Sequence, residues 1–208
     1  GGSVNVGFVR AGDSIGTFTA ASLNRGWISA RDAIGTVSIA GDMFDSSIMA
    51  GVDLGADGRF GGSGADADAV TTGTIGTVSV GGNFRESDIV AGISRGSDGF
   101  FGNADDLVAE GRSTIGSIVI GGNQVGSNVN SESYQIGATG SIGAATIGGV
   151  AARNQANLKV GVIDYDPVAI QVTNLQVDQA SRIFYATMTF NLPIDVSTLS
   201  RALSVSEV

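Results

Sequence analysis

The sequence predicts an all-β fold, a parallel β-helix or β-solenoid whose coils are each about twenty residues long. Three observations predict it. A short pattern that begins Ile-Gly recurs at related spacings along the first three quarters of the chain. Glycine and β-branched residues are abundant, while long runs of helix-forming residues are nearly absent. Apolar residues alternate with polar ones inside each repeat, as expected for strands with one buried face.

The Ile-Gly pattern occurs five times, at residues 15–18, 34–37, 75–78, 115–118 and 142–145. The last four copies reach a further apolar residue five places after the first Ile, at Ile39, Val80, Ile120 and Ile147. In a solenoid, each unit stacks on the unit before it, so equivalent residues form ladders. We therefore expect the isoleucines to line the core.

A second apolar patch follows each first Ile by 13 or 14 residues, at Ile28, Ile48, Ile89 and Val129. We interpret this patch as the second strand of each coil. The first isoleucines are separated by 19, 41, 40 and 27 residues. We interpret these intervals as one coil that is interrupted by insertions. The pattern fits two or three faces and either handedness.

Two other sets of residues recur at one coil position. Gly41, Gly82, Gly122 and Gly149 are expected at tight corners, and Asp42, Asn83 and Asn123, which follow the first three, are expected to form an internal hydrogen-bonded ladder. Phe8 and Trp27 are also equivalent, and we expect stacked rungs or an end cap.

Charge and composition exclude several classes of function. The 208 residues carry a net charge of −9 with one lysine, Lys159, which is the opposite of what a nucleic-acid-binding protein needs. The absence of cysteine and histidine excludes disulfides, zinc–thiolate sites and histidine-based catalytic triads. No apolar run is long enough to span a membrane. An acidic surface favours solubility and divalent cations.

The two longest intervals contain insertions of similar sequence. Both read Gly-x-Asp-Gly-x-Phe-Gly, at residues 55–61 and 96–102, and both continue into an acidic pair. Calcium takes six to eight oxygen ligands, which aspartates on a sharply turned loop provide. The metal ligands that we predict are Asp53, Asp57, Asp66 and Asp68 in the first loop and Asp98, Asp105 and Asp106 in the second. We expect Phe60 and Phe101 to anchor the loops on the flank of the solenoid.

These loops resemble calcium loops of repeat-containing bacterial cell-surface and secreted β-solenoid proteins. They depart from EF-hand loops, because Asp53 and Asp57 are four residues apart and no Glu closes the loop. Ser94 stands where the first loop has Asp53, so we expect the first site to bind calcium more tightly. The alternative interpretation is that the Asp-Gly pairs simply form turns.

The repeats stop near Asp164, which predicts a solenoid over residues 1–163 and a β-rich tail over 164–208. Residues 170–172 and 183–190 alternate like strands. Residues 186–199 resemble the start of a bacterial Ig-like module, so we expect the tail to be a partial module of this kind or a cap on the solenoid.

Together these features predict a non-catalytic structural or adhesive module of a large extracellular or cell-surface bacterial protein. Surface glycans or other cell-surface proteins are the expected partners, and calcium is the expected cofactor. No signal peptide opens the chain, whose first residues already belong to a repeat, so we expect a piece of a longer protein. The alternatives are a carbohydrate-binding β-helix or a polysaccharide lyase or hydrolase. A glycosidase would draw its paired carboxylates from Asp42, Asp45, Glu86 and Asp88.

Overall fold

The computed structural model describes residues 2–5, 7–61, 63–96, 98–127, 129, 132–155 and 157–163, together with the backbone of two strands at 172–178 and 185–190. The chain divides into two compact units, Gly1–Tyr165 and Asp166–Val208. The larger unit contains all of the Ile-Gly repeats.

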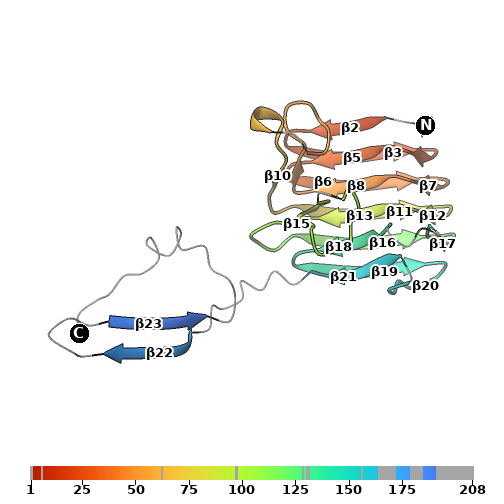
Figure 1. Cartoon of the computed structure of the whole chain (residues 1–208). Helices are drawn as coiled ribbons and strands as arrows, with labels where there is room; N and C mark the ends of the chain where they lie inside the picture. The colour runs from red at the N-terminus through yellow and green to blue at the C-terminus, as the bar shows by residue number, and fades with distance from the viewer. Residues whose placement is uncertain are drawn as a thin grey trace. The chain divides into compact units, whose positions relative to one another are not determined.

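The larger unit is a parallel β-helix with three sheets, and successive coils stack in sequence order (Figure 1). Each full coil contributes one strand to each sheet, which explains why equivalent residues of successive repeats become neighbours. The prediction of an all-β parallel β-helix is confirmed, and the open question of two or three faces is answered as three.

The three sheets differ in strand length. Sheet A has two-residue strands: β1 (Val4–Asn5), β4 (Leu23–Asn24), β7 (Met43–Phe44), β12 (Phe84–Arg85) and β17 (Gln124–Val125). Sheet B contains β2 (Phe8–Ala11), β5 (Trp27–Ala30), β8 (Ser47–Ala50), β13 (Asp88–Ala91), β18 (Tyr134–Ala138) and β21 (Leu158–Val162). Sheet C contains β3 (Ser14–Ala20), β6 (Ala33–Ile39), β11 (Thr74–Val80), β16 (Thr114–Ile120), β19 (Ser141–Ile147) and the antiparallel edge strand β20 (Val150–Ala151).

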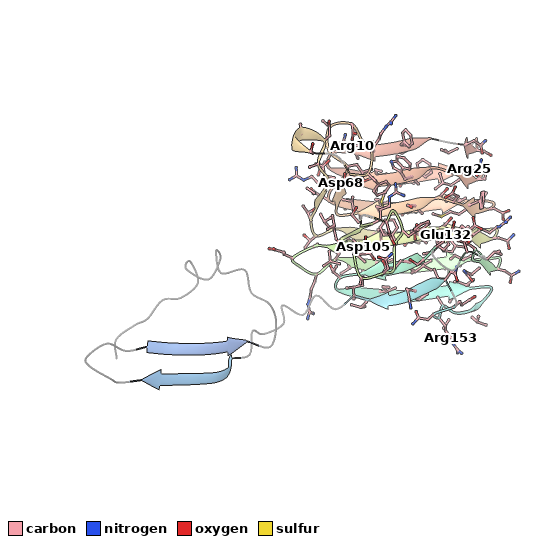
Figure 2. The ribbon with its side chains drawn as sticks, viewed as in Figure 1. Arg10, Arg25, Asp68, Asp105, Glu132 and Arg153 are labelled. Atoms are coloured by element: carbon pink, nitrogen blue, oxygen red, sulfur yellow. The ribbon has the colours of Figure 1, made fainter. Side chains whose placement is uncertain are left out.

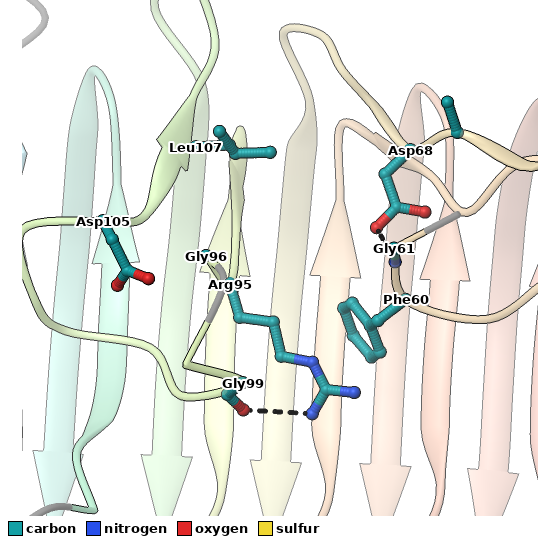
Figure 3. Close-up of a pocket in the computed structure, with 9 residues that line it drawn as sticks. Phe60, Gly61, Asp68, Arg95, Gly96, Gly99, Asp105 and Leu107 are labelled. Atoms are coloured by element: carbon teal, nitrogen blue, oxygen red, sulfur yellow. Dashed lines mark hydrogen bonds between the residues drawn. The ribbon is translucent and has the colours of Figure 1, made fainter. Parts of the chain in front are cut away.

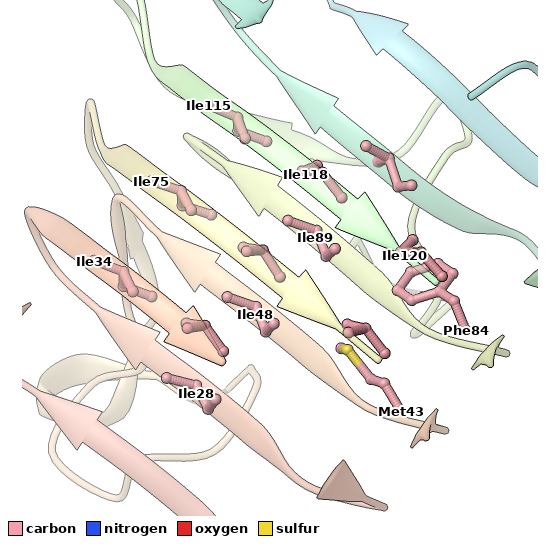
Figure 4. Close-up of a cluster of buried hydrophobic side chains, with 14 of the residues drawn as sticks. Ile28, Ile34, Met43, Ile48, Ile75, Phe84, Ile89, Ile115, Ile118 and Ile120 are labelled. Atoms are coloured by element: carbon pink, nitrogen blue, oxygen red, sulfur yellow. The ribbon is translucent and has the colours of Figure 1, made fainter. Parts of the chain in front are cut away.

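The core lies between the sheets and consists of isoleucine ladders (Figure 4). In sheet C, Ile34, Ile75 and Ile115 are paired in register. In sheet B, Ile28 is paired with Ile48, and Ile48 with Ile89. All of these side chains are buried. Identical β-branched side chains in register pack against one another along the helix axis, so each coil contributes the same contacts to the next.

The glycine of each Ile-Gly pair holds neighbouring coils at close approach. A Cβ atom on Gly76 would overlap the carbonyl oxygen of Gly35, and one on Gly116 would overlap that of Gly76. The same overlap occurs at Gly35 and Gly143. The glycine in the repeat is therefore required by the stacking of coils.

The third face and the last coil differ from the expectation. Leu23, Met43 and Phe84 point into the core from sheet A, a face that was not recognised as strand. Val129 was assigned to the second strand, but it is exposed, and Ile136 is the residue in register with Ile89. The segment between β17 and β18 is longer than the equivalent segment of the other coils. The second strand of this coil therefore begins later than predicted, and the assignment of Val129 to it is wrong.

The polar ladder forms at the corner between sheets C and A. The Asp42 carboxylate accepts the Asn83 backbone N–H at 2.6 Å, and the Asn83 side-chain oxygen accepts the Asn123 N–H at 3.0 Å. The ladder was expected, but it lies at the surface rather than inside. At the corner from sheet A to sheet B, Arg25, Asp45 and Glu86 all adopt positive φ, between 45° and 51°.

The second unit contains an antiparallel pair, β22 (Val172–Asp178) and β23 (Tyr185–Phe190). Most of the stretch that resembles an Ig-like module, residues 191–199, lies outside the described residues. Within the described part of the chain, no helix has the length and hydrophobicity needed to cross a membrane.

Candidate functional site

The two insertions leave the solenoid at the same corner and fold over the outer face of sheet B. The first leaves after β8, and β9 (Val52–Asp53) pairs antiparallel with β10 (Ala69–Val70). The second leaves after β13, and β14 (Ile93–Ser94) pairs antiparallel with β15 (Leu107–Val108). We call them loop 1 (residues 51–73) and loop 2 (residues 92–113). Each is a short hairpin with the Asp-Gly motif at its far end.

A second hydrophobic cluster fixes the loops to the sheet. Met49 and Val90 point outward from sheet B, and Leu54, Ile93 and Phe101 of the loops cover them. All five side chains are buried. Phe101 is fully enclosed and Phe60 packs against the cluster, as the anchoring role predicted for these two phenylalanines requires.

A row of aromatic rings connects the first coils to both loops. Phe8 and Trp27 stack with 4.1 Å between ring centroids, which confirms the predicted rung. Trp27 meets Phe60 edge-on at 5.5 Å, and Phe60 meets Phe101 at 6.3 Å. The rings lie on the outer face of sheet B rather than in the core, and Phe8 is 53% exposed.

The two loops repeat the same hydrogen bonds around their aspartates. The Asp57 carboxylate accepts the N–H of Arg59 at 2.9 Å, and Asp98 accepts that of Phe100 at 2.9 Å. These are turns in which a side chain bonds to the backbone two residues on. Farther along, Asp68 accepts the N–H of Gly61 at 2.9 Å.

Asp106 is the counterpart of Asp68 in loop 2. It accepts the N–H of Gly102 at 2.8 Å. In both residues the other carboxylate oxygen is buried without a hydrogen-bond partner in the described part of the chain. Burial raises the pKa of Asp68, with further contributions from Asp57 and Asp53, and burial also raises the pKa of Asp106 to about 6, helped by Asp105 and Asp98.

The other predicted ligands have different environments. Asp53 forms an ion pair with Arg10 at 2.8 Å, and Asp66 lies in the short 3-10 helix Gly64–Asp66. Asp105 accepts the N–H of Asp98 at 3.1 Å. Figure 2 labels Asp68 and Asp105 on the two loops. Among the described residues, no three acidic side chains converge closely enough to form a metal-binding group.

A cavity of about 600 Å³ lies between the loops, with Asp68 on the side of loop 1 and Asp105 on the side of loop 2 (Figure 3). Arg95 lines it between them. Its guanidinium carbon lies 3.6 Å from the centre of the Phe60 ring, and one nitrogen donates to the Gly99 carbonyl at 3.2 Å. The stacking and the hydrogen bond hold the guanidinium in place beside the acidic loops.

A second cavity of about 380 Å³ lies over the start of the sheet B strands. Trp27, Ser47 and Asp88, which are paired in register on β5, β8 and β13, form its floor. The other side chains around the cavity come from the positive-φ corner, from loop 2 and from the segment that leads into β18. They are Arg25, Asp45, Glu86, Arg95, Phe100, Glu132 and Tyr134. Three of the four carboxylates considered for a glycosidase, Asp45, Glu86 and Asp88, therefore line one cavity.

Asp88 is a buried carboxyl group in the floor of this second cavity. It accepts the N–H of Gln135 at 2.8 Å and the hydroxyl of Ser47 at 3.1 Å. Burial raises its pKa to about 8, although both hydrogen bonds oppose the shift. The sequence did contain a signal for this position, because Asp88 occupies the strand position of Trp27 and Ser47. The cavity itself depends on how loop 2 folds back, which no repeat pattern encodes.

Compared with known proteins, the chain matches no protein-family model, no curated protein and no solved structure.

Proposed function

We propose that this chain is a non-catalytic structural or adhesive module of a large extracellular or cell-surface bacterial protein. The observation that carries this proposal is the regularity of the scaffold. Buried ladders continue through successive coils on sheets B and C, and a polar ladder continues along one corner. Such a scaffold keeps its cross-section when units are added, which suits a rigid spacer. Surface glycans or other cell-surface proteins are the partners that this role implies.

We propose further that loops 1 and 2 bind calcium. The support is that both loops place a carboxylate oxygen, on Asp68 and on Asp106, in a buried position where no described residue hydrogen-bonds to it. A bound cation would supply the missing partner and relieve the repulsion between neighbouring aspartates. Asp53 is engaged by Arg10, so its predicted contribution to a tighter first site requires that this ion pair opens.

Thermal unfolding with EDTA and with millimolar calcium tests the calcium proposal. A ligand that binds only the folded state at a hundredfold excess over its Kd adds about 2.7 kcal/mol to the free energy of unfolding. We expect calcium to raise the melting temperature and magnesium to raise it less. The combined variant Asp68→Asn and Asp106→Asn should lose the calcium response, whereas Asp13→Asn, at an exposed position outside the loops, should keep it. Identical melting curves with EDTA and calcium would contradict the proposal.

The tail fits the same proposal as the start of an Ig-like module, because such modules commonly occur in tandem in long surface proteins. The antiparallel pair β22 and β23 is compatible with this assignment. Release of reducing sugar from polysaccharides by the purified chain would contradict the non-catalytic role.

A further inference from the structure

The second cavity, over the floor of Trp27, Ser47 and Asp88, has the features of a ligand-binding site. Its volume of about 380 Å³ falls within the range of small-molecule sites, about 300–1,000 Å³. It combines ring surface with polar groups. Phe100 and Tyr134 contribute two rings that meet edge to face at 6.4 Å. A cavity of this kind suits a ligand with both apolar and hydroxyl-bearing faces.

Trp27 lines this cavity and carries an unused hydrogen-bond donor. Its Nε1–H is buried and has no acceptor among the described residues. The Phe8 ring already stacks on the indole, and Phe60 contacts it edge-on. A buried polar group normally has a partner. A ligand oxygen bound beside the indole would complete this donor once the atoms that cover the N–H shift locally.

The other polar groups of the cavity are held in fixed positions. Arg95 is held by Phe60 and the Gly99 carbonyl, and Asp88 by Gln135 and Ser47. The Tyr134 hydroxyl donates to Glu132 at 3.0 Å. Groups that are fixed before binding lose little conformational entropy when a ligand arrives.

The balance of charge in the cavity argues against an anionic ligand. Arg25 and Arg95 bring two positive charges, while Asp45, Glu86 and Glu132 bring three negative ones. Asp88 adds no further negative charge near neutral pH, because burial raises its pKa to about 8. A polyuronate or phosphate ligand would meet net repulsion. A neutral ligand rich in hydroxyl groups can both donate to the carboxylates and accept from Trp27 and the arginines.

We propose that this cavity binds a neutral saccharide, with the Trp27 Nε1–H donating to one of its oxygens. The bound segment is short, about one or two sugar rings, given the volume of the cavity. This assignment goes beyond the scaffold role and does not require calcium. It gives the module a specific class of ligand on the sheet B face.

Trp27 is the only tryptophan in the chain, so its fluorescence reports on this cavity directly. The full chain would be titrated with cellotetraose, xylotetraose, mannotetraose and tetra-N-acetylchitotetraose, and with tetragalacturonate as the anionic counterpart. We expect a saturable change in emission with at least one neutral oligosaccharide and none with tetragalacturonate. No change with any neutral probe, or a response to tetragalacturonate alone, would overturn the proposal.

Calorimetric titration of variants with the same saccharide tests which residues contribute to binding. Trp27→Phe keeps an aromatic ring but removes the N–H, and it should weaken binding at least tenfold. Glu132→Gln should also weaken binding, while Val119→Ala, at an exposed position on sheet C, should leave it unchanged. Circular dichroism would verify that each variant is folded. Unchanged affinity in folded Trp27→Phe would contradict the assigned donor.

The titration would be run in EDTA and again in calcium, so the two proposals are tested separately. Saccharide binding in EDTA together with a calcium-independent melting temperature would support this site and refute the calcium proposal. A calcium-dependent melting temperature without any saccharide response would support the calcium proposal and refute the saccharide site.

Discussion

At the scale of single residues, Asp88 departs from the repeat in its chemistry. Its strand position on the outer face of sheet B is occupied by Trp27 on β5 and by Ser47 on β8. Burying a carboxyl group costs free energy unless the group is protonated or well hydrogen-bonded. Asp88 meets both conditions, because it has two hydrogen bonds and its pKa is raised to about 8.

The raised pKa of Asp88 predicts that this residue stabilises the fold more in mild acid than in mild base. The folded value of about 8 lies above the ordinary value of 3.8, so the folded chain binds the proton more tightly than the unfolded chain. The stabilisation from Asp88 is therefore complete below about pH 4 and is lost as the pH rises through about 8. Arg95 favours the charged form, while burial and Asp106 oppose it.

The measurement is the free energy of unfolding by urea between about pH 6 and about pH 9. We expect it to fall across this window in the natural chain and to change much less in Asp88→Asn, since an amide has no proton to lose. Asp13→Asn, which changes an exposed aspartate, should retain the slope. A slope that persists in Asp88→Asn would show that another group is responsible. The raised pKa of Asp106, about 6, acts at lower pH and is largely outside this window.

At the scale of elements, the glycine row of sheet C determines how closely the strands stack. Gly76→Ala places a Cβ atom on the Gly35 carbonyl oxygen, where only backbone movement relieves the overlap. We expect a loss of about 1–3 kcal/mol in the free energy of unfolding, as in other overpacked interiors. Gly16 occupies the same strand position on the first coil, where a Cβ atom has nothing within 4 Å.

Gly16→Ala is therefore a matched control for Gly76→Ala. We expect it to be neutral or to stabilise the fold by about 0.4–1 kcal/mol, because alanine restricts the unfolded chain. Chemical denaturation of both variants beside the natural chain measures the difference. Equal destabilisation by both substitutions would mean that the strand itself needs glycine and that contact between coils is not the reason.

The elements were predictable from the sequence to the extent that they recur. The strands of sheets B and C were found because Ile and Gly return at fixed spacing and alternate in polarity. Sheet A was missed because its strands contain only two residues, and their inward side chains, Leu23, Met43 and Phe84, are of three types. Their common offset of eight or nine residues after each first Ile is the signal that identifies them.

The candidate sites were less predictable, because they depend on contacts that do not repeat. The motif identified the loop turns and the Phe anchors correctly, but their packing against Met49 and Val90 required the three-dimensional path of each loop. Arg10 lies 43 residues before Asp53, and no spacing rule connects them. The second cavity depends in the same way on the tip of loop 2 meeting a corner of sheet A.

At the scale of the whole molecule, the solenoid is a one-dimensional array in which each coil contacts mainly its two neighbours. Stability in such arrays is the sum of the stabilities of the units and of the interfaces between them. The middle coils have an interface on both sides, whereas β3, at one end of the described sheet C, pairs there with β6 alone. The same substitution should therefore have different consequences in the middle and at the end.

The pair Ile75→Ala and Ile15→Ala tests this prediction. Ile75 is fully buried between Ile34 and Ile115, and its truncation leaves a cavity in the centre of the stack. We expect a loss of about 2–5 kcal/mol and lower protection from hydrogen exchange in all coils. Ile15 is only partly buried, so its truncation should lower the protection of β1 to β3 and leave the later coils close to the natural chain. Uniform loss of protection in Ile15→Ala would instead mean that the solenoid unfolds as a single cooperative unit.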